Sequence, residues 1–559
     1  QRLYGAACEA RRRGLRTSRA LDLQATCAER RRGALAALVG VLREADATAV
    51  ERASQAASRL PAVDRCSDFA ALTSEAEPGA TRDPIVLARI ESQHERLALA
   101  RAELEAGHYA RARELTQAVV EESEQLADDP LIAEALIARA AAELALGDYR
   151  ATGATLHRSF TTAEVAGQDD LAADAAVRLV HLHGEREHDL ARAETWAELA
   201  EAKLRRAGDD GVQRPRLLLY LGQTLAAAGR LQDAQPLLDQ AMTLTERRRD
   251  RDPTSYVMAL NASATLAMDK GALDVAEPLL RRSLALREAN LGPEHPSVAV
   301  ARHNLGRLLY ERRDFSRAAA EFRRALEIRE HSLGPEHPGT VQTLNGLGAA
   351  LSDNGDREAG IEIFRRVLAI EERRRGVDHL DLFAPLNNLG QVAINAGELA
   401  TAADYLERAR ALLERQGQGQ SPDQALVLYN LGALRLAAGD PAEAVTLLER
   451  SLILRDQIYG PEHPEVGTSL ALLSEAEFAA AIHDRATIHA ERAITVLRKR
   501  PAGALELGRA RLVLARLRWR DPRTRDEART LAREALKDLT SEARDSEQLR
   551  EVRLWLATH

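Results

Sequence analysis

The chain has 559 residues, of which 45% are apolar, 29% are charged and only 3% are aromatic. So few aromatic side chains are unsuited to several thick globular cores but suit many thin Ala/Leu-packed helical layers, so we expect helices throughout. The 77 basic and 85 acidic residues give a net charge of −8, which gives no reason to expect nucleic-acid binding. No stretch approaches the roughly 18–20 consecutive apolar residues that span a bilayer.

The first segment, residues 1–83, is predicted to be a helical N-terminal segment and linker. Two helices are expected over Leu21–Leu42 and Thr48–Leu60, the second ended by Pro61, and a linker is expected over Glu75–Pro84. Arginine clusters make this segment basic, which we interpret as a solvated helical face. The alternative is an approach to a membrane surface or an acidic partner.

The chain has three cysteines, Cys8, Cys27 and Cys66. Because three is an odd number and none forms a C-x-x-C pair, we expect small buried packing residues and neither a disulfide framework nor a zinc site.

Repeats begin after the linker and organise the rest of the chain. Gly107 and Gly147 lie 40 positions apart and a weaker unit follows around His188, so divergent units are predicted over residues 84–210. Residues 211–540 follow a regular 42-residue period, and each unit is predicted to be two helices joined by a left-handed turn residue. The predicted turn positions are 229, 271, 313, 355, 397, 439, 481 and 523.

Residue size follows the same period. A small residue stands five positions after each turn, a second small residue follows seven positions later, and a larger apolar plug lies between them. Large and small residues also alternate on the preceding helix, so that one helix can approach the other closely. The plugs are Leu238, Leu280, Phe322, Phe364, Leu406 and Leu448, and the alternation includes Leu347-Gly348, Leu389-Gly390 and Leu431-Gly432.

A short motif introduces several units. The sequence L-G-P-E-H-P stands at Leu291–Pro296 and Leu333–Pro338, recurs as Tyr459–Pro464, and degenerates at Arg375–His379. Its glycine ends one helix and its second proline opens the next. The last segment, residues 541–559, is predicted to cap the stack with a helix over Glu547–Leu556.

The pattern resembles the tetratricopeptide repeat, in the longer 42-residue subclass found in kinesin light chains. This resemblance implies an all-α, right-handed superhelical solenoid of about eleven helix pairs, whose first helices line a concave groove. Asn304, Asn388 and Asn430 stand nine positions before three turns, where the resemblance implies a grip on a peptide backbone. The alternative is that these residues brace adjacent helices. The predicted groove residues are His303, Asn304, Arg307, Gln342, Asn345, Asn387, Asn388, Gln391 and Asn430.

Two sets of histidines suggest other roles. His181, His183 and His188 form an H-x-H-x4-H cluster, which suits zinc or copper but which we interpret as a polar helix end, so no metal site is predicted. His295, His337, His379 and His463 recur with the repeat and are interpreted as caps of the loops between units, with pH sensing as the alternative.

The N-terminal segment resembles the stretch that precedes the repeats in large bacterial Ser/Thr protein kinases of the myxobacterial type. The resemblance rests on Ala7–Ala10, Leu21–Leu23, Cys27–Arg31, Leu60–Pro61 and Arg65–Asp68. It implies that this chain is the sensor or regulatory region of such a kinase, although H-R-D, D-F-G and the Gly-rich phosphate loop are absent.

The function expected from the sequence is a non-catalytic scaffold in bacterial signalling, which binds a protein or peptide in the concave groove. We expect no catalytic residue and no cofactor. The identity of the partner and the oligomeric state stay open. The location is expected to be cytoplasmic, or extracytoplasmic if a single membrane span precedes the chain. A small-molecule-sensing regulator of transcription ranks last, since no helix-turn-helix is evident.

Overall fold

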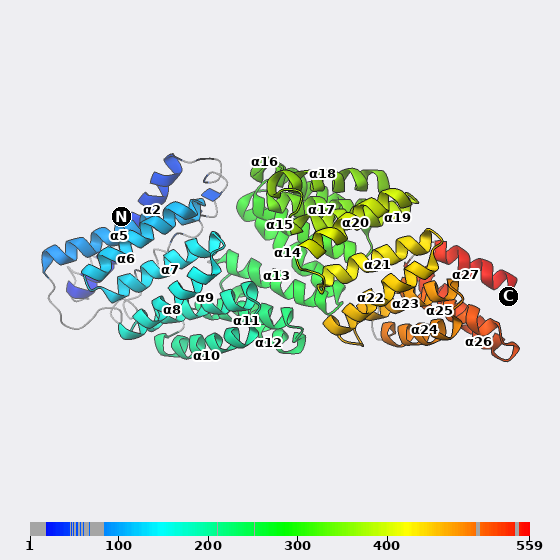
Figure 1. The fold of residues 1–559 in the computed structure, drawn as a ribbon. Coiled ribbons are helices and arrows are strands. Elements are labelled where there is room, and N and C mark those ends of the chain that lie inside the picture. Colours follow the sequence, from blue (N-terminus) through cyan, green and yellow to red (C-terminus); the bar gives the residue numbers. More distant parts are fainter. Residues whose placement is uncertain are drawn as a thin grey trace. The chain divides into compact units, whose positions relative to one another are not determined.

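The structure is a computed structural model, and its regular elements are helices (Figure 1). Within the described residues there is no strand, which confirms the all-α prediction. The chain divides into two compact units between Leu308 and Leu309, and each unit is described by itself. The described residues are 18–44, 46, 49, 52–53, 56–57, 60, 66, 83–208, 211–250, 252–498, 504–542 and 547–559.

The first helix that the structure describes is α2 (Ser18–Arg43), which confirms the first predicted helix; the second predicted helix falls largely outside the described residues. The helices that follow are α5 (Pro84–Ala106), α6 (Tyr109–Gln125), α7 (Asp129–Ala145), α8 (Tyr149–Val165), α9 (Asp169–His181), the π-helix η2 (Leu182–Arg186), α10 (Leu190–Ala207), α11 (Gln213–Ala227), α12 (Leu231–Glu246), α13 (Pro253–Asp269), α14 (Leu273–Leu291) and α15 (Pro296–Glu311), which runs across the division.

The second unit continues the same alternation. Its helices are α16 (Phe315–Leu333), α17 (Pro338–Asp353), α18 (Arg357–Arg375), the 3-10 helix η3 (Leu380–Leu382), α19 (Phe383–Ala396), α20 (Leu399–Arg415), α21 (Pro422–Ala437), α22 (Pro441–Tyr459), α23 (Pro464–Ala479), α24 (His483–Leu497), α25 (Ala504–Trp519), the 3-10 helix η4 (Pro522–Thr524), α26 (Arg525–Glu542) and α27 (Glu547–Thr558).

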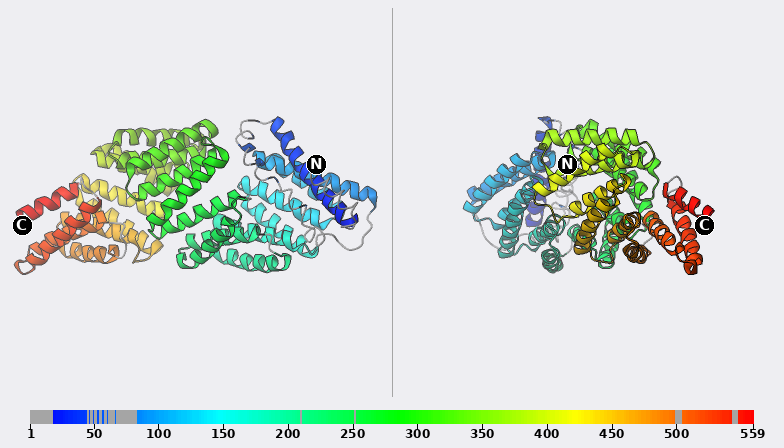
Figure 2. Two further views of the ribbon diagram at one scale, coloured as in Figure 1. Left: turned by 180° about the vertical axis from the view of Figure 1, so that it is seen from behind. Right: turned by 45° about the vertical axis from the view of Figure 1, so that its right-hand side comes forward.

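The helices from α5 to α26 form eleven consecutive pairs among the described residues, which confirms the expected repeat solenoid. In each unit the helices stack in chain order (Figure 2). Within the second unit, the first helices α17, α19, α21, α23 and α25 contact one another in succession. They therefore form one row, and the second helices form the other.

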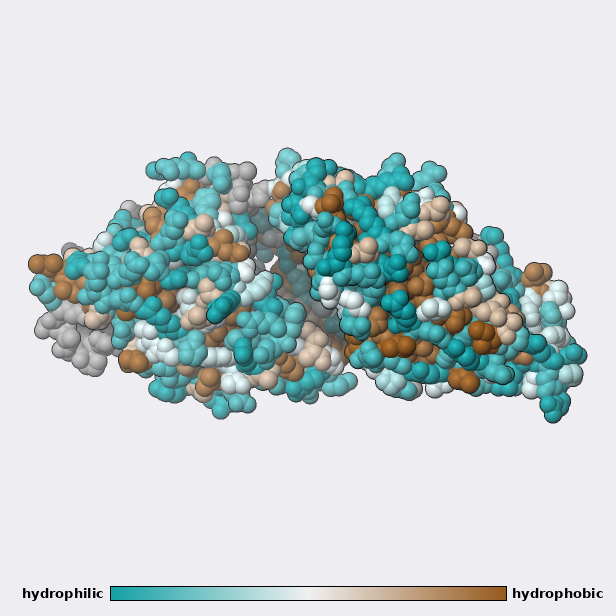
Figure 3. Space-filling view, viewed as in Figure 1, coloured by the Kyte–Doolittle hydropathy of each residue, from teal (hydrophilic) through white to brown (hydrophobic). Residues whose placement is uncertain are grey.

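Ion pairs with a sequence separation of 36 residues link second helices of successive pairs. Examples are Glu246 with Arg282 at 3.1 Å, and Asp456 with Arg492 at 3.0 Å. These side chains are exposed or half-buried, so each pair contributes about 0.2–1 kcal/mol at most. The hydrophilic residues that dominate the face in Figure 3 agree with a stack held together from inside.

The inside contact is a plug in the second helix that meets a glycine in the first. A Cβ atom built on Gly390 would lie 2.5 Å from Cγ of Leu406, and one built on Gly432 would lie 2.6 Å from Cγ of Leu448. Gly348 meets the ring of Phe364 in the same way. All three plugs are buried, which confirms the predicted matching of residue sizes.

A residue with a left-handed backbone follows nearly every helix of the repeats. These residues recur every 20 to 22 positions in the second unit: Arg313, Gly334, Gly355, Gly376, Gly397, Gly417, Gly439, Gly460 and Ala481. The φ angles of Arg313 and Ala481 are 58° and 61°, so two predicted turn positions are confirmed even though glycine is absent.

The turn predicted at Arg523 is wrong. Helix α25 ends at Trp519, and Arg523 lies inside the 3-10 helix Pro522–Thr524 without a left-handed backbone. Asp521 accepts a hydrogen bond from the backbone N–H of Arg523 at 2.9 Å, and the ring of Pro522 fixes its own φ angle in the helical range. This local capping replaces the left-handed turn.

The cysteine interpretation is also wrong for two of the three residues. Cys27 in α2 and Cys66 form a disulfide, with their Cα atoms 5.6 Å apart. The sequence separation of 39 residues gave no spacing signal, because the fold of the N-terminal segment brings the two residues together. Cys8 lies outside the described residues.

No described helix is both long enough and apolar enough to cross a membrane. The last helix, α27, packs on α26, and its Trp555 is buried beside Trp519.

We predict that Ala481→Gly stabilises the chain by about 1 kcal/mol, because a left-handed backbone costs residues with a Cβ atom roughly 1–2 kcal/mol. Ala411 is the matched control: it is exposed inside α20, where Ala411→Gly should destabilise by about 0.5–1 kcal/mol. Urea denaturation measures both changes. If both substitutions destabilise the chain, the left-handed turn at residue 481 is wrong.

Candidate functional site

The predicted groove residues lie on the first helices of four successive pairs. Gln342 and Asn345 lie on α17, Asn387, Asn388 and Gln391 on α19, and Asn430 on α21, all in the second unit. His303, Asn304 and Arg307 lie on α15 in the first unit. Gln342 and Arg307 are exposed, Asn304, Asn345, Asn388 and Gln391 are half-buried, and His303, Asn387 and Asn430 are buried.

Two of the predicted residues bind each other. The side-chain NH2 of Asn430 donates a hydrogen bond to Oδ1 of Asn387 at 2.8 Å, and the two residues are only 2% and 6% exposed. This bond connects α19 to α21. The Asn387–Asn430 pair therefore braces adjacent first helices, which is the alternative that the sequence left open.

The preceding pair of helices has the same two positions but not the same bond. Asn345 and Asn388 stand one repeat period before Asn387 and Asn430. Oδ1 of Asn345 is buried, and no described residue donates a hydrogen bond to it. Such an acceptor costs roughly 1–3 kcal/mol when it is left unpaired. We call the Asn387–Asn430 pair the closed layer, because the two side chains are hydrogen-bonded to each other. We call the Asn345–Asn388 pair the open layer, because it lacks this bond.

Gly346 interrupts the run of asparagines, and a bulky side chain of the preceding pair of helices lies against it. A Cβ atom on Gly346 would lie 2.7 Å from Cε1 of Phe322, the plug of the preceding pair. An asparagine side chain does not fit there, so this position has no amide to offer.

Arg307 faces a carboxylate of the chain itself. Burial raises the pKa of Asp269 at the end of α13, and the charge of Arg307 acts in the opposite direction. Arg307 is therefore electrostatically coupled to Asp269 within the first unit.

Sequence reasoning missed further residues of this row of first helices, on α21, α23 and α25. Tyr429 occupies the position of Asn345 and Asn387 in the next unit, and burial raises the pKa of its phenol. The guanidinium of Arg455 lies 4.9 Å from the centre of the Tyr429 ring. Farther along, Nε of Arg509 lies 3.1 Å from a carboxylate oxygen of Glu475. The 42-residue spacing was the signal that pointed to Tyr429.

The four repeated histidines are caps, as predicted. In each case Nδ1 accepts a hydrogen bond from the backbone N–H two residues later. The donor residues and distances are Ser297 at 3.1 Å for His295, Gly339 at 3.0 Å for His337, Asp381 at 3.2 Å for His379 and Glu465 at 3.2 Å for His463.

Three arginines, which sequence reasoning also missed, fix three of the same loops; Arg329 and Arg455 are buried and Arg287 is half-buried. Arg287 donates to the backbone oxygen of Ser297 at 2.6 Å, and Arg455 to that of Glu465 at 2.9 Å. Arg329 donates to the backbone oxygen of Gly339. Burial lowers the pKa of Arg287 to about 10. Their 42-residue period was visible in the sequence.

The other histidine cluster is a polar helix end. His183 is buried, and its Nδ1 lies 2.8 Å from a carboxylate oxygen of Glu187. Nδ1 of His181 lies 3.4 Å from a carboxylate oxygen of Glu185, and His188 is the left-handed residue after the π-helix. Within the described part of the chain, no group of three or more His, Cys, Asp or Glu side chains is placed to hold a metal ion.

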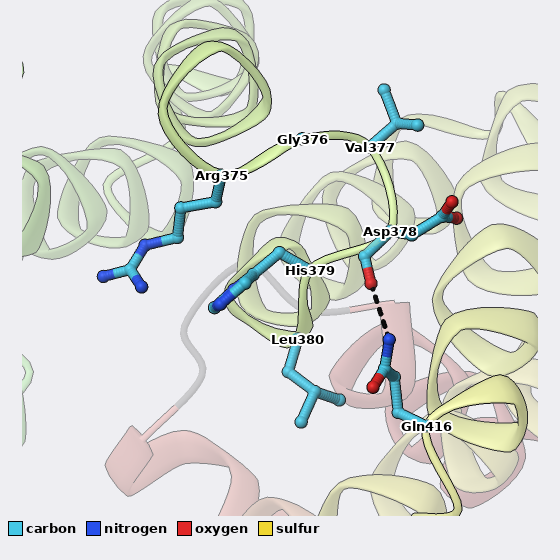
Figure 4. A pocket seen from close by; sticks show the side chains of 7 residues that line it. All are labelled: Arg375, Gly376, Val377, Asp378, His379, Leu380 and Gln416. Atoms are coloured by element: carbon cyan, nitrogen blue, oxygen red, sulfur yellow. Dashed lines mark hydrogen bonds between the residues drawn. The ribbon is translucent and has the colours of Figure 1, made fainter.

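A hollow of about 380 Å³ lies in the second unit at the degenerate motif, beside Arg375, Asp378, His379 and Gln416 (Figure 4). Its polar groups bind one another: the side-chain NH2 of Gln416 donates to the backbone oxygen of Asp378 at 3.0 Å. Arg375 pairs with Asp381 at 2.9 Å. These polar groups are therefore already paired within the chain, so few of them are left to bind a ligand.

We predict that the cap of His295 weakens in mild acid. Burial and the nearby Arg287 lower its pKa, so below about pH 6.5 the unfolded chain takes up a proton that the folded chain resists. The stability from this cap is therefore complete above about pH 6.5 and is lost as the pH falls. His295→Asn keeps an acceptor but does not titrate, so its denaturation midpoint should change less between about pH 7 and pH 5.

The matched control is His331→Asn, at an exposed position on α16. If His295→Asn and His331→Asn follow the wild-type pH dependence equally, the His295 cap does not contribute to it.

Comparisons with known proteins bear on the regular repeats. A family model described as "Tetratricopeptide repeat" matches residues 255–331, 339–415 and 423–499. No curated protein matches the chain.

Solved structures share the helical architecture at low sequence identity. The apo form of RapI is 13% identical with a TM-score of 0.50, and the match covers 67% of this chain and 98% of RapI. BtubC from P. vanneervenii is 23% identical over 41% of this chain and 92% of its own, with a TM-score of 0.37. Repeats of a putative kinesin light chain from Podosopora anserina are 24% identical over 37% of this chain and 98% of their own, with a TM-score of 0.32.

At such identities a structural likeness shows the fold alone, and of these three only the RapI match is close enough in shape to support it. The family match is independent of this and falls on the segments with the regular 42-residue period. Residues 255–331, 339–415 and 423–499 of this chain therefore consist of tetratricopeptide repeats.

Proposed function

We propose that this chain is a non-catalytic scaffold that binds an extended peptide of a partner protein along α17, α19 and α21. The observation that carries the proposal is the buried Oδ1 of Asn345, which accepts no hydrogen bond from the described residues. It lies in the row of first helices, where the open Asn345–Asn388 layer adjoins the closed Asn387–Asn430 layer.

An extended peptide has the groups that the open layer lacks. Each residue of such a peptide presents one N–H and one C=O along its backbone. Oδ1 of Asn345 is buried, so the half-buried side chain has to turn toward the groove before a peptide N–H can donate to it. That bond removes the cost of an unpaired acceptor, and the amide of Asn388 can bind a peptide carbonyl. Recognition of this kind depends on the backbone and tolerates many side chains.

The closed layer has a supporting role in this proposal. The Asn387–Asn430 bond fixes α19 against α21, so the adjacent Asn388 is held in one position. Gln342 and Gln391 add amides beside the open layer.

The predicted groove residues of α15 lie in the first unit, and their part in peptide binding is a separate proposal from the contacts on α17, α19 and α21. The α15 residues are His303, Asn304 and Arg307. The coupling of Arg307 to Asp269 speaks against a clamp for a free C-terminal carboxylate, because the charge of Arg307 already acts on a carboxylate of the chain.

We propose that these repeats belong to the kinesin-light-chain type of tetratricopeptide repeat, because of their 42-residue period and their cap motif. One of the compared structures is of a putative kinesin light chain. A groove that receives peptide segments of other proteins fits that assignment.

A second proposal concerns the parent polypeptide. We infer that the chain is the regulatory region of a bacterial Ser/Thr kinase, because its N-terminal motifs resemble those of such kinases. The Cys27–Cys66 disulfide links two of these motifs and favours an oxidising compartment, beyond a membrane span that precedes the chain. Reading the open reading frame upstream of Gln1 tests this: H-R-D, D-F-G and an apolar span of about 20 residues support it. A start codon shortly upstream rejects it.

The groove is tested with a double variant, Asn345→Ala with Asn388→Ala. Peptides selected from a random display library on the wild-type chain should bind this variant at least about tenfold more weakly, because two amide contacts are lost. Fluorescence polarisation of the labelled peptides measures the dissociation constants. Asn395→Ala, at an exposed position at the end of α19, is the control and should bind like the wild type.

Asn430→Ala separates bracing from binding. It leaves Oδ1 of Asn387 buried without its donor, so the free energy of unfolding should fall by about 1–3 kcal/mol. The double variant should not lose stability in this way, because it removes an unpaired acceptor. Peptides that bind the double variant as tightly as the wild type would refute the proposed groove.

A further inference from the structure

A separate hollow lies in the first unit, far along the chain from the proposed groove. It measures about 510 Å³ and lies between α8, α10 and the end of α9. Small-molecule sites commonly occupy about 300–1,000 Å³, so one or two aromatic rings fit. Its residues play no part in the tetratricopeptide match, which begins at residue 255.

One wall of this hollow contains a π-helix, at a point where the unit is one residue longer than the unit before it. The left-handed residues Gly107 and Gly147 lie 40 positions apart, but the next one in this series, His188, follows after 41 positions. The chain absorbs the extra residue as the π-helix Leu182–Arg186, the one such segment among the described residues. π-Helical turns inside α-helices occur frequently at functional sites.

The π-helix is held firmly against its neighbour. A Cβ atom on Gly184 would clash with the side chain of Thr224 in α11, so the absence of a side chain at residue 184 lets the two helices pack. The preceding residue, His183, lines the hollow and is 8% exposed. The wall that carries His183 is therefore preformed.

His183 presents a defined hydrogen-bonding group. Its Nδ1 lies 2.8 Å from a carboxylate oxygen of Glu187, and because a carboxylate accepts, the neutral form of the ring carries its proton on Nδ1. Nε2 is then an acceptor, and no described residue binds it. A ligand in the hollow that carries an O–H or N–H donor can bind there.

Aromatic side chains form another wall. Trp196 contacts His157 edge-on with ring centres 5.8 Å apart, and Phe160 edge-on at 5.1 Å, so its ring is fixed. Trp196, His157 and Tyr149 line the hollow. Flat aromatic molecules pack favourably against such rings in offset or edge-on arrangements.

The rim carries two arginines, and the carboxylate of Glu187, which pairs with His183, also lines the hollow. Arg150 and Arg192 both line the hollow and are exposed. Arg192 already has a partner in Asp189 at 3.3 Å. Arg150 stands in the first turn of α8, where the end of the helix also favours an anion. A carboxylate at the rim would bind Arg150.

We propose that this hollow binds a small aromatic carboxylate that carries a hydrogen-bond donor on its ring, such as a hydroxyaryl or indolyl acid. The ring lies against Trp196, the donor binds Nε2 of His183 and the carboxylate binds Arg150. The same chemistry is present in a free metabolite and in an aromatic residue at the C-terminus of a peptide.

Isothermal titration calorimetry of the full chain tests the proposal with three probes: indole-3-acetate, 4-hydroxyphenylacetate and N-acetyl-tryptophan. At least one should bind with a dissociation constant of about 1 mM or tighter, the affinity expected of ligands this small. Tighter binding of the first two identifies a free acid, and tighter binding of the third identifies a peptide C-terminus. Absence of binding by all three at about 5 mM overturns the proposal.

Two substitutions locate the binding. A Cβ atom on Gly153 meets Leu182 only at an ordinary 3.4 Å, so Gly153→Phe can place its ring in the hollow and should abolish binding. Arg150→Gln should weaken the acids about tenfold or more and leave indole-3-acetamide, which has no charge, unchanged. Arg158→Gln on the same helix is the control and should bind as the wild type does.

Unchanged binding in Gly153→Phe contradicts the location, provided that circular dichroism shows the variant folded. An equal loss of the acid and the amide in Arg150→Gln contradicts the role of the charge. Because α17, α19 and α21 lie in the other unit, none of these variants should change peptide binding there.

Discussion

The structure depends on a contact between a large side chain and an absent one. In three successive pairs, from α17 to α22, a buried plug of the second helix lies against a glycine of the first, and a single added methyl group at Gly390 would overlap Leu406. Interiors are packed too densely to absorb such an overlap without movement. In these pairs the glycine lets the two helices approach closely, and the contact recurs with the 42-residue period of the stack.

The regularity explains which features can be read from the sequence. The turns at Arg313 and Ala481 are predictable without a glycine, because their neighbours in the stack require a turn in the same register. The prediction fails at Arg523 because local capping by Asp521, next to Pro522, outweighs the register at the end of the stack. The disulfide of the N-terminal segment escapes prediction because that segment has no repeats.

Only part of the candidate groove could be predicted from the sequence. The period identified the first helices and their asparagines, but it did not reveal which asparagines face each other. The bond joins Asn387 to Asn430, residues 43 positions apart, so it connects non-equivalent positions of successive 42-residue units. A Cβ atom on Gly346 would overlap the ring of Phe322, a contact that the period alone did not indicate. Both contacts join residues that lie far apart in the sequence, so the periodicity of a single helix does not reveal them.

The two proposed sites share a physical origin, since each lies where the repeat is imperfect. In the second unit, one layer of amides is left open beside a closed one. In the first unit, a π-helix stands in one wall of the hollow beside His183. Regular contacts build the stack, and irregular positions leave groups that a ligand can satisfy.

The plug contact itself is tested most directly by a double-mutant cycle on Gly390→Ala and Leu406→Ala, with the free energy of unfolding measured for all four chains. Each substitution alone should destabilise, by about 1–3 kcal/mol for the added methyl group and about 2–5 kcal/mol for the truncated plug. Together they should cost less than their sum by about 1–3 kcal/mol, because the alanine at 406 makes room for the alanine at 390. Additivity within about 0.5 kcal/mol would contradict the size-matched contact on which the stack depends.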